Sequence, residues 1–237
     1  MSRVTTLSVG GLTVHALDAG IQQLDGGAMF GVVPKPLWSR RIVPDERNRI
    51  VLAMRPLLIE HDDGLVLVDT GLGNKESDKF RDIYGVENAG ADGRTALEDA
   101  MAELGHRAED VKIVVDTHLH FDHAGGNTFI AADDAERRVQ PAFPNARYVI
   151  HRREFEFASR ANERTQGSYF EANWRPVVEA GQADFRDGPA GEIVPGVRVL
   201  VTPGHTPWHW SVLIERQGET LFYPADVIPT AHHLPLP

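Results

Sequence analysis

The chain carries a dense cluster of side chains of the kind that bind metal ions. Within six residues it has three histidines and one aspartate, in the run His118-x-His120-x-Asp122-His123. Alternate residues of an extended segment point the same way, so His118 and His120 can grip one ion. Asp122 and His123 follow where the chain turns into a helix, and they can hold a second ion. This spacing predicts a metal site rather than a polar loop that happens to be rich in histidine.

The elements that must position this cluster are those of an α/β protein with many short strands. Residues 113–116 form an apolar strand directly before the cluster, so the metal site is expected at the carboxyl end of a strand. A hairpin is expected at the N-terminus, and a second strand pair around the turn at residues 62–64. The expected strands cover residues 5–9, 12–17, 50–60, 65–69, 113–116, 147–150, 197–201, 211–215 and 220–223.

Helices are expected between some of these strands. The capping box Thr95-x-x-Glu98 predicts a helix over residues 95–104. Less regular patterns favour helices at residues 152–160 and 169–180. Residues 19–48 contain several glycines and prolines with little periodicity, which predicts a long ordered loop that forms a wall or lid. Because there is no internal repeat or linker, residues 1–237 are expected to form one domain.

The composition limits what the chain can bind. Its 237 residues include no cysteine, so thiolate ligands are excluded and any metal must be held by nitrogen and oxygen. A formal net charge of -10 opposes binding to a phosphate backbone, so nucleic acid is not an expected partner. The apolar runs are too short to cross a bilayer and no signal segment is visible, so we expect a cytoplasmic protein without a membrane partner.

Four motifs stand in order along the chain: Leu65-Val66-Leu67-Val68-Asp69-Thr70-Gly71, His118-Leu119-His120-Phe121-Asp122-His123-Ala124-Gly125-Gly126, Val201-Thr202-Pro203-Gly204-His205-Thr206-Pro207 and Phe222-Tyr223-Pro224-Ala225-Asp226. Together they resemble the motifs of the metallo-β-lactamase superfamily. The histidine-aspartate run is especially similar to that of the N-acyl-homoserine lactonase branch. The resemblance covers residues 65–226 and implies an αββα sandwich with a metal site at one edge of its two sheets.

The resemblance implies a role for each matching position. Asp69 would fix the ligand loop by hydrogen bonds, and Asp122 and Asp226 would take part in catalysis. Zinc is the first expectation for both ions, and iron, manganese or cobalt would accept similar ligands. The implied ligands are His118, His120 and His205 for the first ion, Asp122 and His123 for the second, and Asp226 as the bridge between them.

The chain departs from the family pattern in two places. The superfamily has a further metal-binding histidine well after the bridging aspartate, whereas this chain ends eleven residues after Asp226. We therefore expect a truncated form, or one that another subunit completes. His232 and His233 are the only later histidines, and they either ligate or face substrate or solvent. The lactonase branch often has a tyrosine where this chain has Pro229, which leaves the specific lactone open.

Other side chains are candidates to surround the site. Met29, Phe30 and Trp38 in the expected N-terminal loop, with His233, could line a substrate pocket. The alternative for the loop residues is a hydrophobic plug beneath the loop. His209 follows the third ligand histidine closely and is a candidate to support the site.

Together these features predict a metal-dependent hydrolase in which a hydroxide held by the metal ions attacks a small ester or lactone. A thioesterase of the glyoxalase II type and an organophosphate hydrolase are the alternative enzymes. A degenerate metal-binding scaffold with an incomplete second site is the alternative that is not an enzyme. The expected partner is a small-molecule substrate, and the sequence is compatible with a homo-oligomer.

Overall fold

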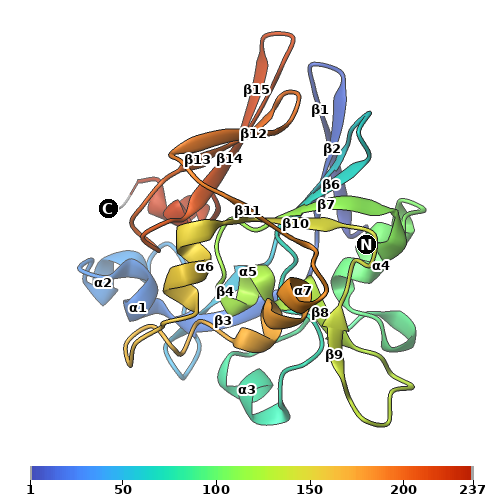
Figure 1. The fold of residues 1–237 in the computed structure, drawn as a ribbon. Coiled ribbons are helices and arrows are strands. Elements are labelled where there is room, and N and C mark those ends of the chain that lie inside the picture. Colours follow the sequence, from blue (N-terminus) through green and yellow to red (C-terminus); the bar gives the residue numbers. More distant parts are fainter. Residues whose placement is uncertain (1, 236–237) are drawn as a thin grey trace.

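The computed structural model describes residues 2–235 and is built around two facing β-sheets (Figure 1). In the larger sheet the strand order is β1-β2-β5-β6-β7-β10-β11. Strands β6, β7, β10 and β11 run parallel, so their carboxyl ends lie at one edge. The strands are β1 (Val4–Val9), β2 (Leu12–Leu17), β5 (Leu57–Glu60), β6 (Leu65–Val68), β7 (Val111–Val115), β10 (Arg147–His151) and β11 (Ala183–Arg186).

The smaller sheet is an antiparallel meander in the order β12-β13-β14-β15. It packs on one face of the larger sheet, and aliphatic side chains of both sheets form one buried cluster between them. Val66 and Val115 of the larger sheet and Val212 of the smaller one are fully buried there. The strands are β12 (Ala190–Val194), β13 (Val197–Val201), β14 (Trp210–Arg216) and β15 (Glu219–Tyr223).

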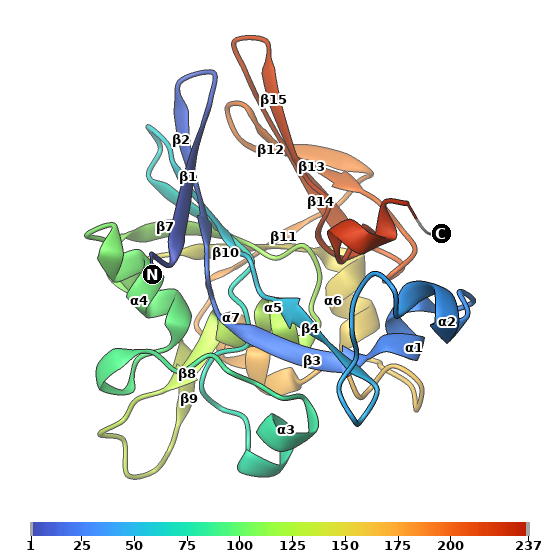
Figure 2. The same ribbon diagram turned by 180° about the vertical axis from the view of Figure 1, so that it is seen from behind.

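Helices lie on the other side of the larger sheet (Figures 1 and 2). Leu67 and Val114 point to this side and share a second buried cluster with Met101 and Val177 from two of the helices. Because the central strands are buried on both faces, they are apolar throughout rather than alternating. The helices are α3 (Asp78–Ile83), α4 (Ala96–Glu103), α5 (Phe121–Ala124), α6 (Arg152–Ala158) and α7 (Arg175–Glu179). This arrangement confirms the predicted α/β sandwich.

Residues 19–56 form a separate layer that we call the N-terminal arm. It contains β3 (Ile21–Asp25), α1 (Gly26–Phe30), α2 (Lys35–Trp38) and β4 (Arg49–Ala53). Strands β3 and β4 pair antiparallel, outside both larger sheets. The prediction of a loop at residues 19–48 was therefore wrong. Its elements are four or five residues long, too short for periodicity to be visible among the glycines and prolines.

Two other predicted elements are divided in the structure. The strand expected at residues 50–60 is wrong as one unit, because β4 pairs with β3 and the chain enters the large sheet only at β5. Pro56 lies between them and cannot donate to a sheet. The helix expected at residues 169–180 forms only α7 and a preceding 3-10 turn. Pro176 lacks an N–H and is tolerated only in a first helical turn, so the helix begins beside it.

The remaining elements are short. Strands β8 (Thr128–Ile130) and β9 (Val139–Pro141) form a hairpin that the sequence patterns did not indicate. The 3-10 turns are η1 (Ala91–Gly93), η2 (Ala108–Asp110), η3 (Gly125–Asn127), η4 (Glu171–Asn173), η5 (Ala225–Val227) and η6 (Ala231–His233). Within residues 2–235, no helix has the length and apolar character needed to cross a membrane.

Candidate metal centre

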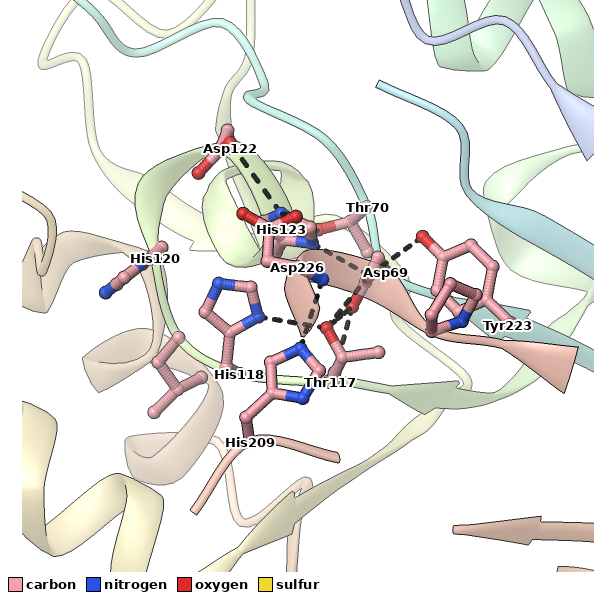
Figure 3. Close-up of polar contacts among 12 residues, drawn as sticks. Asp69, Thr70, Thr117, His118, His120, Asp122, His123, His209, Tyr223 and Asp226 are labelled. Atoms are coloured by element: carbon pink, nitrogen blue, oxygen red, sulfur yellow. Dashed lines mark hydrogen bonds and ion pairs between the residues drawn. The ribbon is translucent and has the colours of Figure 1, made fainter. Parts of the chain in front are cut away.

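The predicted ligands meet where the loops after β7, β13 and β15 converge. Figure 3 shows those of the loops after β7 and β15. Two groups of side chains each place their ligand atoms within 4.8 Å of one another. His118 belongs to both groups, so they are adjacent. Asp122 is in neither group, and its Oδ2 lies 3.7 Å from Nε2 of His123 at their margin. The first group is His118, His120 and His205, and the second is His118, His123 and Asp226.

The hydrogen bonds of His118 leave one ring nitrogen free to bind a metal. Thr117 Oγ1 lies 2.9 Å from a carboxylate oxygen of Asp69 and donates to it, because a carboxylate only accepts. The same hydroxyl oxygen lies 3.1 Å from His118 Nδ1 and therefore accepts its proton. His118 Nε2 keeps a lone pair, and this buried atom has no hydrogen-bond partner among residues 2–235. An unpaired buried lone pair is costly, so the residues fit a bound cation.

The first group consists of imidazoles that remain neutral at ordinary pH. Burial lowers the pKa of His118, His120 and His205, and neighbouring imidazoles lower it further. Nδ1 of His120 and Nε2 of His205 are 2.9 Å apart. Neutral imidazoles offer lone pairs, and a set of three matches the protein ligands of catalytic zinc sites.

The second group concentrates negative charge around one histidine. Nε2 of His123 lies 3.1 Å from Oδ1 of Asp226, whose other oxygen lies 3.3 Å from Nε2 of His205. Asp226 thus contacts both groups, as its predicted bridging position requires. Burial lowers the pKa of His123, but the carboxylates of Asp226, Asp122 and Asp69 outweigh burial and raise it well above its usual value. The carboxylates therefore favour a cation at this position.

Asp69, at the end of β6, holds the ligand loop in place. Its carboxylate accepts hydrogen bonds from Thr117 N at 2.9 Å, His123 Nδ1 at 2.9 Å and the Tyr223 hydroxyl at 3.1 Å (Figure 3). The backbone of Asp69 is left-handed, with φ of 58°, a conformation that aspartate tolerates better than most residues. The contact from Tyr223 was not predicted, although the residue stands within the motif that ends at Asp226.

Close backbone approach also fixes the loop. A Cβ atom added to Gly126 would overlap the carbonyl oxygen of Thr70. The Thr70 hydroxyl donates to the carbonyl oxygen of His123 at 2.9 Å. The glycine therefore lets the end of β6 pass directly behind the ligand helix α5.

His209 contacts the backbone of Asp226, the predicted bridging residue. Its Nε2 accepts a hydrogen bond from the backbone N–H of Asp226 at 3.2 Å, and its Nδ1 lies 3.0 Å from Thr202 Oγ1. The ring is fully buried, and burial lowers its pKa to about 4. His209 thus lies where sequence reasoning expected a supporting residue.

Glu154 joins the two segments that carry the first group, and sequence reasoning missed it. Its carboxylate is buried and accepts from Thr206 Oγ1 at 2.8 Å, Tyr169 Oη at 3.0 Å and Leu119 N at 3.3 Å. Leu119 stands between two ligand histidines, and Thr206 follows the third. Glu154 is an ordinary-looking glutamate on α6, so no local signal marks this role.

A cavity of about 180 Å³ opens onto the second group. The N-terminal arm contributes Gln22, Met29 and Leu52 to its lining, and the segment from β15 onward contributes Tyr223 and Ile228. A larger cavity of about 280 Å³ lies on the other side of the Thr70–Gly126 contact and lacks the ligand side chains in its lining. The smaller cavity is therefore the one lined by predicted metal ligands.

The structure separates the four residues expected to line a pocket. Met29 lines the cavity, whereas Phe30 and Trp38 stack on each other in the buried core of the arm. The pocket assignment is wrong for Trp38, which is 1% exposed and forms the plug considered as the alternative. His233 stacks on Phe30, and its ring nitrogens contact Met29 O at 2.9 Å and Thr230 Oγ1 at 2.8 Å. In this arrangement neither nitrogen of His233 is directed to the metal groups.

Comparison with known proteins defines the class. Residues 56–237 match the family model of the metallo-beta-lactamase superfamily, and the chain belongs to this superfamily. It is similar to an N-acyl homoserine lactonase of Bacillus cereus, with 32% identity over an alignment of 182 residues that covers 73% of this chain. The chain spans 63% of the length of that curated relative.

Solved structures share the fold. A probable metal-dependent hydrolase from Staphylococcus aureus superposes with a TM-score of 0.84 at 32% identity, covering 96% of this chain and 77% of that one. A dizinc quorum-quenching lactonase in complex with its product superposes with a TM-score of 0.69 at 22% identity, covering 93% and 73% of the two chains. The second likeness establishes the fold alone.

Proposed function

We propose that the chain is a metal-dependent hydrolase of small esters or lactones, with two divalent ions, zinc first, held by the predicted ligands. The observation that carries the proposal is the buried Nε2 of His118, which has no hydrogen-bond partner in the described part of the chain and belongs to both ligand groups. The lactonase relative supports an ester or lactone substrate. We further propose that the arm and the sheets act as one domain, because the arm lines the cavity at the site.

The proposed roles follow from the donor set. His118, His120 and His205 would hold one ion, His123 and Asp122 the other, and Asp226 would contact both. When bound, such ions lower the pKa of water and polarise a carbonyl oxygen.

The chain's own side chains would handle the protons. Asp226 is in place to accept a proton from the attacking water, since its carboxylate contacts both ligand groups. Asp122 lies in the cavity wall beside it and is in place to receive that proton from Asp226 and pass it on to the leaving oxygen. Water then adds to the carbonyl carbon, the carbon–oxygen bond of the ester breaks, and a carboxylic acid and an alcohol result. In a lactone both products remain in one molecule.

The apolar side of the cavity favours a substrate with an apolar substituent. Met29, Leu52 and Ile228 contribute hydrophobic lining close to His123. A hydrophobic wall beside a few convergent polar groups is typical of small-molecule sites.

The test is a substrate panel on the zinc-loaded chain: lactones, aryl esters, a phosphotriester and a glutathione thioester. We expect turnover of lactones or aryl esters that is lost in His118→Ala and kept in His106→Ala, a histidine outside the site. Preference for the phosphotriester or the thioester would replace the proposed substrate class. If the chain bound metal but turned over none of these substrates, the alternative of a degenerate metal-binding scaffold would be favoured.

A further inference from the structure

Gln22, in strand β3 of the N-terminal arm, is a buried amide at the edge of the candidate metal centre. Its side chain is 2% exposed and lines the same cavity as Asp122 and His123. Its strand partner in β4 is Leu52, and Met54 lies just beyond, so its surroundings are largely apolar. A buried amide in such surroundings costs free energy unless its polar atoms find partners.

One of the two polar atoms of Gln22 has a partner that matters for the site. Nε2 donates a hydrogen bond to Oδ2 of Asp122, which is 100 residues away in the sequence. A carboxylate only accepts, so the amide nitrogen rather than the oxygen must face Asp122. Oε1 is buried with no partner within residues 2–235. The side chain therefore leaves one atom unpaired in order to keep its contact with Asp122.

The carboxylate of Asp122 accepts a hydrogen bond from its own backbone N–H, and the one from Gln22 comes from outside its loop. Asp122 lies in the first turn of the four-residue helix α5, and its nearest cationic neighbour, His123 Nε2, is 3.7 Å from Oδ2. By contrast, Asp226 touches two ligand histidines at 3.1 and 3.3 Å. The hydrogen bond from Gln22 therefore adds to the control of how the Asp122 carboxylate is rotated.

We propose that Gln22 is a positioning residue that orients Asp122 for the second metal ion, so that the N-terminal arm tunes the affinity of that ion. This inference rests on the proposed two-ion site. Gln22 lies outside residues 56–237, which match the superfamily model, so its contribution is a property of the arm. Hydrogen-bond partners of metal ligands commonly change metal affinity by about 10- to 100-fold.

The test is a competition titration of zinc against a chromophoric chelator, on the full chain. Gln22→Met removes the donor but keeps an unbranched side chain of similar volume that suits its apolar neighbours. Gln22→Asn keeps an amide one methylene too short to reach, and serves if the first variant does not fold. Gln23→Met is the matched control, because adjacent residues of a strand point to opposite faces.

We expect two binding steps in the wild type, and a selective weakening of one step by about 10- to 100-fold in Gln22→Met. The other step, and both steps of Gln23→Met, should stay as in the wild type. In an Asp122→Ala background, Gln22→Met should add little, because its effect passes through Asp122. If Gln22 had a merely structural role, Gln22→Met would weaken both binding steps. Its loss of zinc affinity would then add to that of Asp122→Ala in the double variant.

Three results would overturn the inference. Two unchanged steps in Gln22→Met, or an equal weakening of both, would remove Gln22 from this role while leaving the two-ion site intact. A wild-type chain that takes up no more than one ion would overturn the proposed site, and the inference with it.

Discussion

The ligand loops and the N-terminal arm line one cavity and differ in the side chains they contribute to it. The loops leave the ends of buried strands and carry histidines and carboxylates held by mutual hydrogen bonds. The arm is a small separate layer around Phe30, Trp38 and Ile50, and its Gln22 donates a hydrogen bond to the predicted ligand Asp122. In the proposed function the loops supply the chemistry, and the arm shapes what reaches it.

The ligand segments also have left-handed backbone at residues other than glycine. Asp69 and Ala225, both beside ligand segments, have left-handed φ values of 58° and 45°. Such conformations cost energy for residues with a Cβ atom, and they are kept where the surrounding structure requires them. Strain of this kind next to Asp226 is consistent with a loop shaped for a site rather than for stability.

The largest effect we expect from a change outside the ligands themselves is that of Asp69→Asn. The new amide would place donors where Thr117, His123 and Tyr223 already donate. We predict a fall in kcat/KM of about 10- to 100-fold on the zinc-loaded chain. Asp63→Asn, in an exposed turn, is the matched control and should behave as the wild type. If Asp69→Asn were as active as the wild type, the ligand loop would not depend on its contacts with Asp69 at the end of β6.

A smaller effect should follow from Met29→Ala in the arm. Loss of apolar wall should raise KM for substrates with apolar substituents by roughly fourfold for each methylene contact removed, with kcat little changed. Val32→Ala is the control, because Val32 is 93% exposed on the same arm. Steady-state kinetics with one substrate that has a short apolar substituent and one that has a long one would separate the effect on KM from the effect on kcat. A drop in kcat alone would show that the arm acts on the chemistry rather than on binding.

The smallest effect concerns the strain before Asp226. Ala225→Gly should raise the free energy of unfolding by about 0.5 kcal/mol, because glycine adopts a left-handed backbone without a Cβ penalty but loses more entropy on folding. Ala102→Gly in the exposed face of α4 should instead lower it by about 1 kcal/mol. Urea unfolding measures both. If Ala225→Gly instead lowered the free energy of unfolding, the claim that the backbone at Ala225 is strained would be refuted.

The sequence was sufficient for the parts of the site that are local. His118, His120 and His123 share one short run after a buried strand, and spacing alone indicated their chemistry. The roles of His205 and Asp226 came from resemblance, and the structure brings both to the same place.

Other parts depend on contacts that no local pattern encodes. The bond from Gln22 to Asp122 joins residues 100 apart, and Glu154 gathers donors from three separate segments. The arm was read as a loop because its elements are too short for periodicity. For Trp38 the sequence leaves a pocket wall and a hydrophobic plug both open, because an aromatic residue looks the same in a pocket and in a small core.

The central claim is that two adjacent ligand groups share His118 and hold two ions. Native mass spectrometry of the full chain, stripped of metal and reloaded with zinc, tests it most directly. We predict two ions per wild-type chain and about one in either Asp122→Asn or His118→Ala, because each of these residues would hold one of the two ions. A wild type with no more than one ion, or a His118→Ala variant that still holds two, would contradict the account.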